Sequence, residues 1–182
     1  DIINDFIFSS NNENQLNNLD TNFDLLIRNI NTYGNLSDTY KDDMQYKVLG
    51  TAMLNLKYPL FKQTELDKNY LTPMASLRYS PSKGMNLKNE VTLITFEDLF
   101  RLDRINKKSV EHGASATFGS EYKNINTSDE ERFKFGAGMN FKNTKDDDLP
   151  ISSSLGEKTS DIIGYSGINI TENLSLDYNQ NI

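Results

Sequence analysis

The chain has 182 residues, of which 36% are hydrophobic and 25% charged, and its formal net charge is −7. Its mean hydropathy is −0.61, and its apolar runs fall far short of the roughly 20 residues that a membrane-spanning helix needs, which excludes a helical membrane protein. The acidic balance provides no basic stripe to neutralise phosphates, so we expect no nucleic-acid partner. With no Cys and a single His, the sequence offers no disulfide framework and no set of zinc ligands, and we expect no metal site and no cofactor.

Apolar residues recur at every second position in eight stretches. This period predicts β-strands, because successive side chains of a strand point to opposite faces. The expected strands span residues 2–9, 17–30, 45–58, 70–80, 109–123, 132–142, 161–170 and 174–182. Helical patterns are scarce, and only residues 96–105, inside a long loop, could form a turn or two. The predicted fold class is therefore all-β, an antiparallel meander of about eight long strands.

The lengths of the connections alternate along the chain. Short connections are expected at 10–16, 124–131 and 171–173, and long polar ones at 31–44, 81–108 and 143–160. The connection at 59–69 is intermediate and begins with Pro59, which cannot donate to a ladder and so ends the preceding strand. Short and long connections on opposite ends of a sheet are typical of an outer-membrane β-barrel, with short turns in the periplasm and long loops outside. On this interpretation odd strands run inward and even strands outward.

Alternation alone also fits a soluble β-sandwich, since both folds have one apolar face. Two features favour the barrel: several strands exceed the five or six residues usual in globular proteins, and the other face carries many charges, as a hydrated lumen would. The residues predicted to face the lumen are Lys47, Lys57, Glu121, Arg132, Lys134 and Asp177.

A second polar set lies in or beside the long 81–108 connection. It comprises Arg78, Asp98, Arg101, Asp103 and Arg104. One interpretation is a structural network of arginine–carboxylate pairs that folds the loop into the mouth of the barrel. The other is contact with lipid phosphates or sugars. The structural interpretation is favoured, and both stay open.

No residue pattern predicts catalysis. The one histidine, His112, is expected near the rim of the outward face, without the nucleophile and orienting acid that a Ser-His-Asp site requires. The acidic residues 146–148, with Glu157 and Asp161, could supply oxygen ligands to calcium, but they lack EF-hand spacing. A solvated acidic loop is the favoured interpretation.

Several segments, in order along residues 45–182, resemble one known family. They are Leu71-Thr72-Pro73-Met74-Ala75-Ser76-Leu77-Arg78-Tyr79-Ser80-Pro81, the stretch Phe96-Glu97-Asp98-Leu99-Phe100-Arg101-Leu102-Asp103-Arg104-Ile105, then Val110-Glu111-His112-Gly113, and Asp148-Leu149-Pro150 followed by Leu155-Gly156-Glu157-Lys158-Thr159-Ser160-Asp161-Ile162-Ile163-Gly164. They are similar to the LPS-assembly protein LptD, also called organic solvent tolerance protein, and the last segment is similar to the alphaproteobacterial form.

The resemblance implies an outer-membrane barrel that inserts lipopolysaccharide (LPS) into the outer leaflet and is not an enzyme. It implies as partners LPS, outer-membrane lipid, an LptE-like lipoprotein plug and a periplasmic Lpt bridge that docks on an N-terminal jellyroll. Residues 1–182 would then be a partial barrel of middle strands, with the jellyroll and the closing strands outside them. Two alternatives stay open: another outer-membrane barrel, such as a porin or receptor, and a soluble surface β-sandwich that binds a ligand. Because a partial barrel has open edges, we expect these residues not to fold alone in water.

Overall fold

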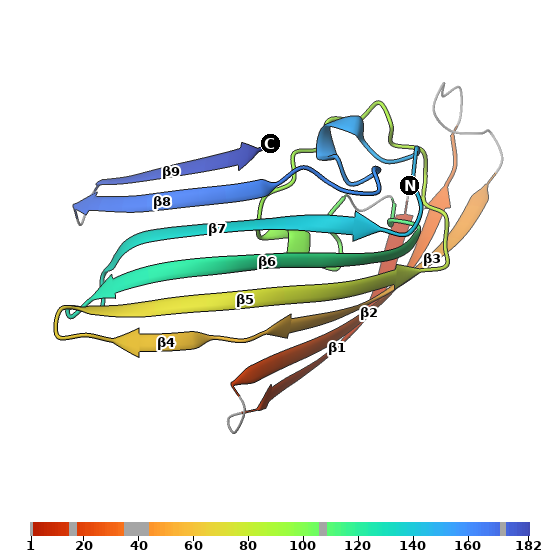
Figure 1. The fold of residues 1–182 in the computed structure, drawn as a ribbon. Helices are drawn as coiled ribbons and strands as arrows, with labels where there is room; N and C mark the ends of the chain where they lie inside the picture. Colours follow the sequence, from red (N-terminus) through yellow and green to blue (C-terminus); the bar gives the residue numbers. More distant parts are fainter. Residues whose placement is uncertain (1, 15–17, 35–43, 106–108, 172–173) are drawn as a thin grey trace.

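The fold is known from a computed structural model, which describes residues 2–14, 18–34, 44–105, 109–171 and 174–182. These residues form a single antiparallel sheet, shown in Figure 1. Its strands are β1 (Ile2–Asn14), β2 (Leu19–Thr32), β3 (Gln45–Lys57), β4 (Leu60–Gln63), β5 (Asp67–Ser80), β6 (Gly113–Asn126), β7 (Glu131–Lys142), β8 (Ile163–Thr171) and β9 (Leu174–Asn181). Two 3-10 turns, η1 (Asp98–Phe100) and η2 (Ile151–Ser153), lie in the long connections.

The strands pair in chain order, β1-β2-β3-β5-β6-β7-β8-β9, with β4 paired to β5. This meander confirms the predicted all-β antiparallel class. The sheet is open at β1 and β9, and within the described residues no second sheet packs against it, so the sandwich alternative is wrong. The first turn, around residues 15–17, and much of the 31–44 connection lie outside the described residues.

The predicted connection at 59–69 is wrong in part, because it contains the four-residue strand β4. Tyr58 and Pro59 interrupt an otherwise continuous line: β3 pairs with residues 74–79 of β5, and β4 with residues 68–71. Pro73 lies between these two pairings, and its carbonyl oxygen accepts a hydrogen bond from Tyr58 N at 3.0 Å. A proline inside a central strand is tolerated here because the ladder is already interrupted. Four residues are too few to show alternation, so β4 could not be predicted from the pattern.

The expected strand 109–123 begins four residues later, at Gly113. Gly113 has a φ of 88°, a conformation that glycine adopts without the steric cost that other residues pay. The chain turns there from the long connection into β6. Residues 109–111 are buried within the long connection and do not pair as a strand.

The two faces of the sheet have different surroundings. The described parts of the connections after β5 and β7 fold back against one face, at the end where β5 and β7 finish (Figure 1); they are residues 81–105, 109–112 and 143–162. We call this the covered face and the opposite one the open face. The long connections, which were expected to be polar, contain buried apolar side chains, since they pack on the sheet rather than extend into solvent.

Candidate functional site

The two long connections form one folded unit on the covered face. We call their described residues, 81–105, 109–112 and 143–162, the loop cap. Their apolar side chains and the first residue of β8 make one buried cluster, which comprises Leu87, Ile94, Phe96, Leu99, Ile105, Leu149, Leu155 and Ile163. The backbone joins them as well, since Leu87 N donates to Asp148 O at 2.7 Å. Burial of this shared cluster stabilises both connections in one arrangement.

Glycines on the covered face of β6 and β7 make room for the cap. A Cβ added to Gly136 would lie 3.1 Å from Cε1 of Phe96, and one added to Gly138 would lie 3.1 Å from Cδ1 of Leu99. At Gly119 an added Cβ would meet the ring of Phe96 at the same distance, 3.1 Å. These three glycines form a trough in which the ring of Phe96 and the side chain of Leu99 rest directly on the backbone of the sheet.

Arg104, one of the predicted polar residues, is the centre of a buried cluster. Its Nε donates to Glu111 Oε1, and its Nη2 donates to Glu111 Oε2 at 2.9 Å. Nη1 donates to Leu99 O at 2.8 Å and to Thr117 Oγ1 at 3.3 Å, and Nη2 also donates to Asn140 Oδ1 at 2.9 Å. One guanidinium thereby ties the loop cap to both β6 and β7.

The ionisation of Glu111 follows from these neighbours. Burial alone would raise the pKa of its carboxyl group, but the charge and hydrogen bonds of Arg104, together with the positive charges of Arg78 and Lys142, outweigh burial and hold the pKa at about 2. The group is therefore a carboxylate at neutral pH and part of a buried, hydrogen-bonded ion pair.

Arg78, in β5, holds the cap from below. Its guanidinium donates to the carbonyl oxygens of Leu102 and Arg101, and Nη2 lies 3.4 Å from the sulfur of Met53. These are backbone groups of the cap, so a strand residue supplies donors that the irregular loop backbone needs when it is buried.

A third arginine anchors the cap at the other side of the sheet. Arg28, in β2, donates Nε and Nη2 to Asp5 of β1, both at 2.7 Å, and Nη1 and Nη2 to Asp103 of the cap at 3.3 and 2.7 Å. Its side chain is 1% exposed. The pairing is bidentate toward each carboxylate, a geometry that favours arginine over lysine.

The remaining two residues of the predicted polar set lie at the surface of the cap. Asp98 Oδ2 accepts hydrogen bonds from Thr95 N at 3.0 Å and from its hydroxyl at 2.7 Å, while Oδ1 pairs with Arg101 Nη1 at 3.1 Å. Asp98 thus stabilises the turn that leads into η1. The structure places Arg78, Asp103 and Arg104 between cap and strands, and the Asp98–Arg101 pair apart from them.

Four of the predicted lumen residues lie on the covered face near the short-turn ends of the strands. They are Lys57, Glu121, Lys134 and Asp177. Lys57 lines a groove of about 550 Å³ between β1–β3 and residues 100–103. The other three line a second groove, of about 340 Å³, between β6–β9 and residues 95–97. The loop cap therefore separates two open regions of the covered face.

The other two predicted lumen residues are placed differently. Lys47 lies beneath the cap and donates Nζ to Gly84 O at 2.7 Å. Arg132 stands at the short-turn rim, where the β6–β7 register shifts, and pairs with Asp67 at 3.3 Å. The bulge inserts Arg132 as an extra residue between Glu131 and Phe133 and so interrupts the alternation, which is why the periodic pattern could not assign Arg132 to a face.

Sequence reasoning missed part of the buried network. The missed residues are Asp5, Arg28, Glu111, Thr117, Asn140, Lys142 and Asp146. Alternation already puts most of the strand members on the charged face. The path of the folded cap, which brings Glu111 and Asp146 to these strand residues, could not be predicted from the sequence.

The candidate metal ligands are held by protein partners. Asp146 Oδ2 accepts a hydrogen bond from His112 N at 3.2 Å, and Asp148 pairs with Lys83 at 2.8 Å. Glu157 pairs with Lys145 at 2.8 Å. Across the part of the chain that the structure describes, no three acidic or histidine side chains are grouped so that they could hold a metal ion.

The open face carries an exposed apolar band that runs obliquely across the strands. On β1 the band centres on Phe6 and Phe8. The residue of β5 that lies in line with Phe8, across β2 and β3, is Tyr79, which is near the long-loop end of β5. On β8 and β9 the band centres on Ile168 and Leu176, which pair with each other. Ile168 also pairs with the short-turn end of β7, so the band lies nearer the short turns here than it does on β5. An apolar band oblique to the strands is what a bilayer requires of a barrel whose strands tilt by roughly 35–45°.

None of the helices in the described ranges has the length and apolar character to cross a bilayer.

A family model described as LptD, LPS transport system D, matches residues 7–181. The chain belongs to the LptD family. No curated protein matches it. LptD proteins are outer-membrane proteins of LPS transport, and the all-β antiparallel sheet agrees with that assignment. The family is one of transport and assembly rather than a known family of enzymes, and LPS is its substrate within the Lpt system. The match does not distinguish bacterial classes, so the alphaproteobacterial form stays a prediction.

Proposed function

We propose that this LptD-family sheet is part of the wall of a barrel that inserts LPS into the outer leaflet, with the covered face toward a hydrated lumen and the open face toward lipid. The observation that carries the proposal is the opposition of the two faces. The open face has an oblique band of exposed apolar side chains, and the covered face has charged residues and two open grooves.

The grooves are the part of the covered face suited to a polar headgroup. The second groove brings together cations, carboxylates and amides, among them Lys123, Lys134, Glu121 and Asn179. Such groups exchange hydrogen bonds with sugars and phosphates without forming covalent bonds. We assign these groove residues, rather than Arg78 and Arg104, to contact with LPS in transit, because the groove side chains are partly exposed while both arginines are buried against protein groups.

The loop cap fits the outer mouth of such a barrel. If short turns face the periplasm, the cap lies at the extracellular end, where β5 and β7 finish. The buried ion pairs would then hold the cap inside the mouth, leaving the grooves open toward the periplasmic end from which LPS arrives.

The open sheet requires further elements. A barrel has no free edges, so additional strands must pair with β1 and β9 to close it. We propose that residues 1–182 are a partial barrel of middle strands in a longer chain. An LptE-like lipoprotein would lie against the lumen, and an N-terminal jellyroll would receive LPS from the periplasmic Lpt bridge.

Neighbouring residues on opposite faces provide the test. Asp177 and Leu176 are adjacent in β9, both exposed, and point to the covered and open faces respectively. A photo-crosslinking amino acid would be placed at each position in the full-length protein in growing cells. We expect adducts to the sugar portion of LPS from position 177, and adducts to lipid acyl chains from position 176. LPS-sugar adducts from 176 and none from 177 would overturn the assignment of the faces.

A further inference from the structure

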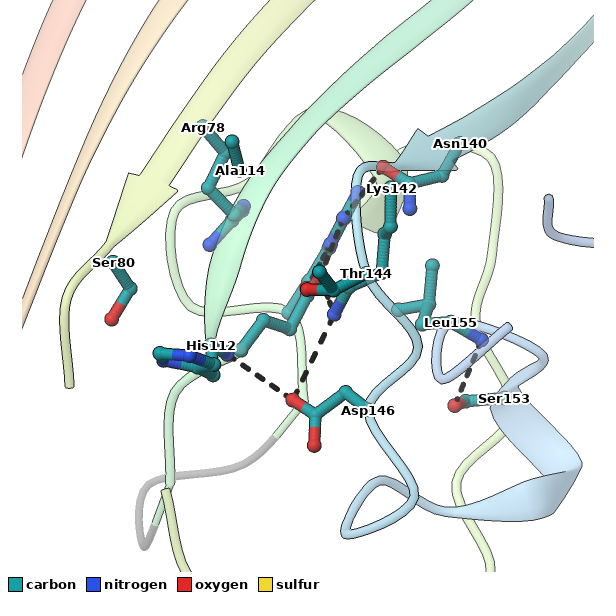
Figure 2. Close-up of polar contacts among 12 residues, drawn as sticks. Arg78, Ser80, His112, Ala114, Asn140, Lys142, Thr144, Asp146, Ser153 and Leu155 are labelled. Carbon is teal, nitrogen blue, oxygen red and sulfur yellow. Dashed lines mark hydrogen bonds and ion pairs between the residues drawn. The ribbon is translucent and has the colours of Figure 1, made fainter. Parts of the chain in front are cut away.

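Lys142, the last residue of β7, is a buried cation between the two segments of the loop cap. Its Nζ lies 3.8 Å from Glu111 Oε2 in the first segment and 3.8 Å from Asp146 Oδ2 in the second. The side chain is 0% exposed, and within the described residues Nζ has no hydrogen-bond partner. Figure 2 shows Lys142 reaching toward Asp146 from the end of the strand.

The two carboxylates do not depend on Lys142 for their own hydrogen bonds. Glu111 is held by Arg104 through both oxygens. Asp146 accepts from His112 N at 3.2 Å through Oδ2 and from Asp148 N at 3.3 Å through Oδ1. Lys142, however, depends on the two carboxylates, because burial of its ammonium group is unfavourable unless negative charge is near. Here that negative charge is divided between the two segments of the cap.

We propose that Lys142 is a positioning residue that couples the two segments of the loop cap, so that the described residues of the first segment (81–105 and 109–112) and those of the second (143–162) dock and undock together. When either segment leaves, one of the two carboxylates near Nζ leaves with it, and the remaining one no longer balances the cost of the buried ammonium. The position of each segment thereby affects the stability of the other. This inference goes beyond the proposed function, and its test does not measure LPS transport.

A surface ion pair joins the same two segments and serves as the matched control. Lys83 Nζ lies 2.8 Å from Asp148 Oδ2, and the lysine side chain is 71% exposed. Exposed pairs of this kind contribute little, because water and salt screen them. Asp148→Asn therefore removes a charge of the same sign from the same segment without affecting the buried lysine.

The test is hydrogen–deuterium exchange of the full-length protein in lipid nanodiscs, comparing Asp146→Asn with Asp148→Asn. Asparagine keeps one side-chain oxygen, which can accept from His112 N–H, so Asp146→Asn removes the charge beside Lys142 together with the acceptor that Asp148 N–H uses. We expect exchange about tenfold faster in peptides from both 81–112 and 143–162, a size within the range measured for coupled buried neighbours. Asp148→Asn should change exchange less than twofold in the 81–112 peptides.

The Lys142→Met background identifies the residue that transmits the effect. With the ammonium removed, Asp146→Asn should accelerate exchange only in 143–162 peptides. The proposal is overturned if Asp146→Asn never accelerates exchange in 81–112, if Asp148→Asn does so equally, or if the effect persists in Lys142→Met. Should Lys142→Met fail to fold, the comparison of the two aspartate variants decides by itself.

Discussion

The covered face has two halves with the same kinds of residue in different surroundings. Near the long-loop end, Arg28 and Arg78 are buried beneath the loop cap, Arg104 of the cap is buried against the strands, and all three bind protein groups. Near the short-turn end, Lys57 and Asp177 stand exposed beside open grooves. The difference shows that a charged residue on the covered face has no single role. Whether a loop covers it decides whether it holds the fold together or remains available to a ligand.

Substitution of Arg104 should destabilise the buried half of the covered face more than any of the other changes considered below. Arg104→Met leaves the buried carboxylate of Glu111 without its hydrogen-bonded partner, with Lys142 Nζ 3.8 Å away, and removes the donors to Leu99 O and Asn140. Breaking one partner of a buried pair typically costs about 3–5 kcal/mol, and we expect a loss of that order in the free energy of unfolding. Guanidinium unfolding of the full-length protein in lipid vesicles measures it. A loss below about 1 kcal/mol would contradict the central place assigned to Arg104.

Acid should reproduce part of this loss. The pKa of Glu111 lies at about 2 in the folded protein, below its ordinary value of 4.5. A lowered pKa stabilises the fold above the unfolded-state value, so this contribution is present above about pH 4.5 and is lost as the pH falls toward 2. Unfolding measured across that window should show a smaller pH dependence in Glu111→Gln than in the unmodified protein. Equal slopes would contradict the buried ion pair.

Filling the glycine trough should have a smaller effect. Gly138→Val places side-chain carbons where Phe118 O of β6 and Leu99 Cδ1 of the cap already lie 3.0 and 3.1 Å from an ideal Cβ, so both the sheet and its packing with the cap are strained. Overpacking of this kind costs about 1–3 kcal/mol. Limited proteolysis should then cut the cap sooner. Gly50→Ala is the control, since its added Cβ meets only Leu26 O at 3.9 Å.

The exposed half should tolerate substitution. Lys57→Met and Asp177→Asn should each change the unfolding free energy by less than about 0.5 kcal/mol, as surface substitutions usually do. Instead, each substitution should change the yield of LPS adducts formed by a photo-crosslinking amino acid at a neighbouring position of the same groove. A destabilisation as large as that of Arg104→Met would remove the distinction between the two halves.

The strands were predictable because their signal is local. Alternation over eight or more residues located eight of the strands, and the same alternation put Lys57, Glu121 and Lys134 on the charged face. The short strand β4 escaped because four residues carry too little period, and Arg132 escaped because a bulge breaks the alternation.

The loop cap was not predictable to the same extent, because its path is set by non-local packing. The stretch 96–105 was expected to make a turn, but a local pattern shows neither its burial in the glycine trough nor the hydrogen bonds of Arg104 with Glu111 and Asn140. The ion pairs illustrate this: Arg28 and Asp103 are 75 positions apart, and only the folded cap brings them to 2.7 Å.

The glycine trough leaves the wall only one backbone thick between Phe96 and the open-face residue Phe118. Since the sequence has no Trp, a tryptophan introduced at either position would be the sole indole in these residues. A brominated acyl chain should quench the fluorescence of the one at 118 more strongly than that of the one at 96. Thus, two fluorophores separated by a single peptide layer would report on lipid and on the cap independently.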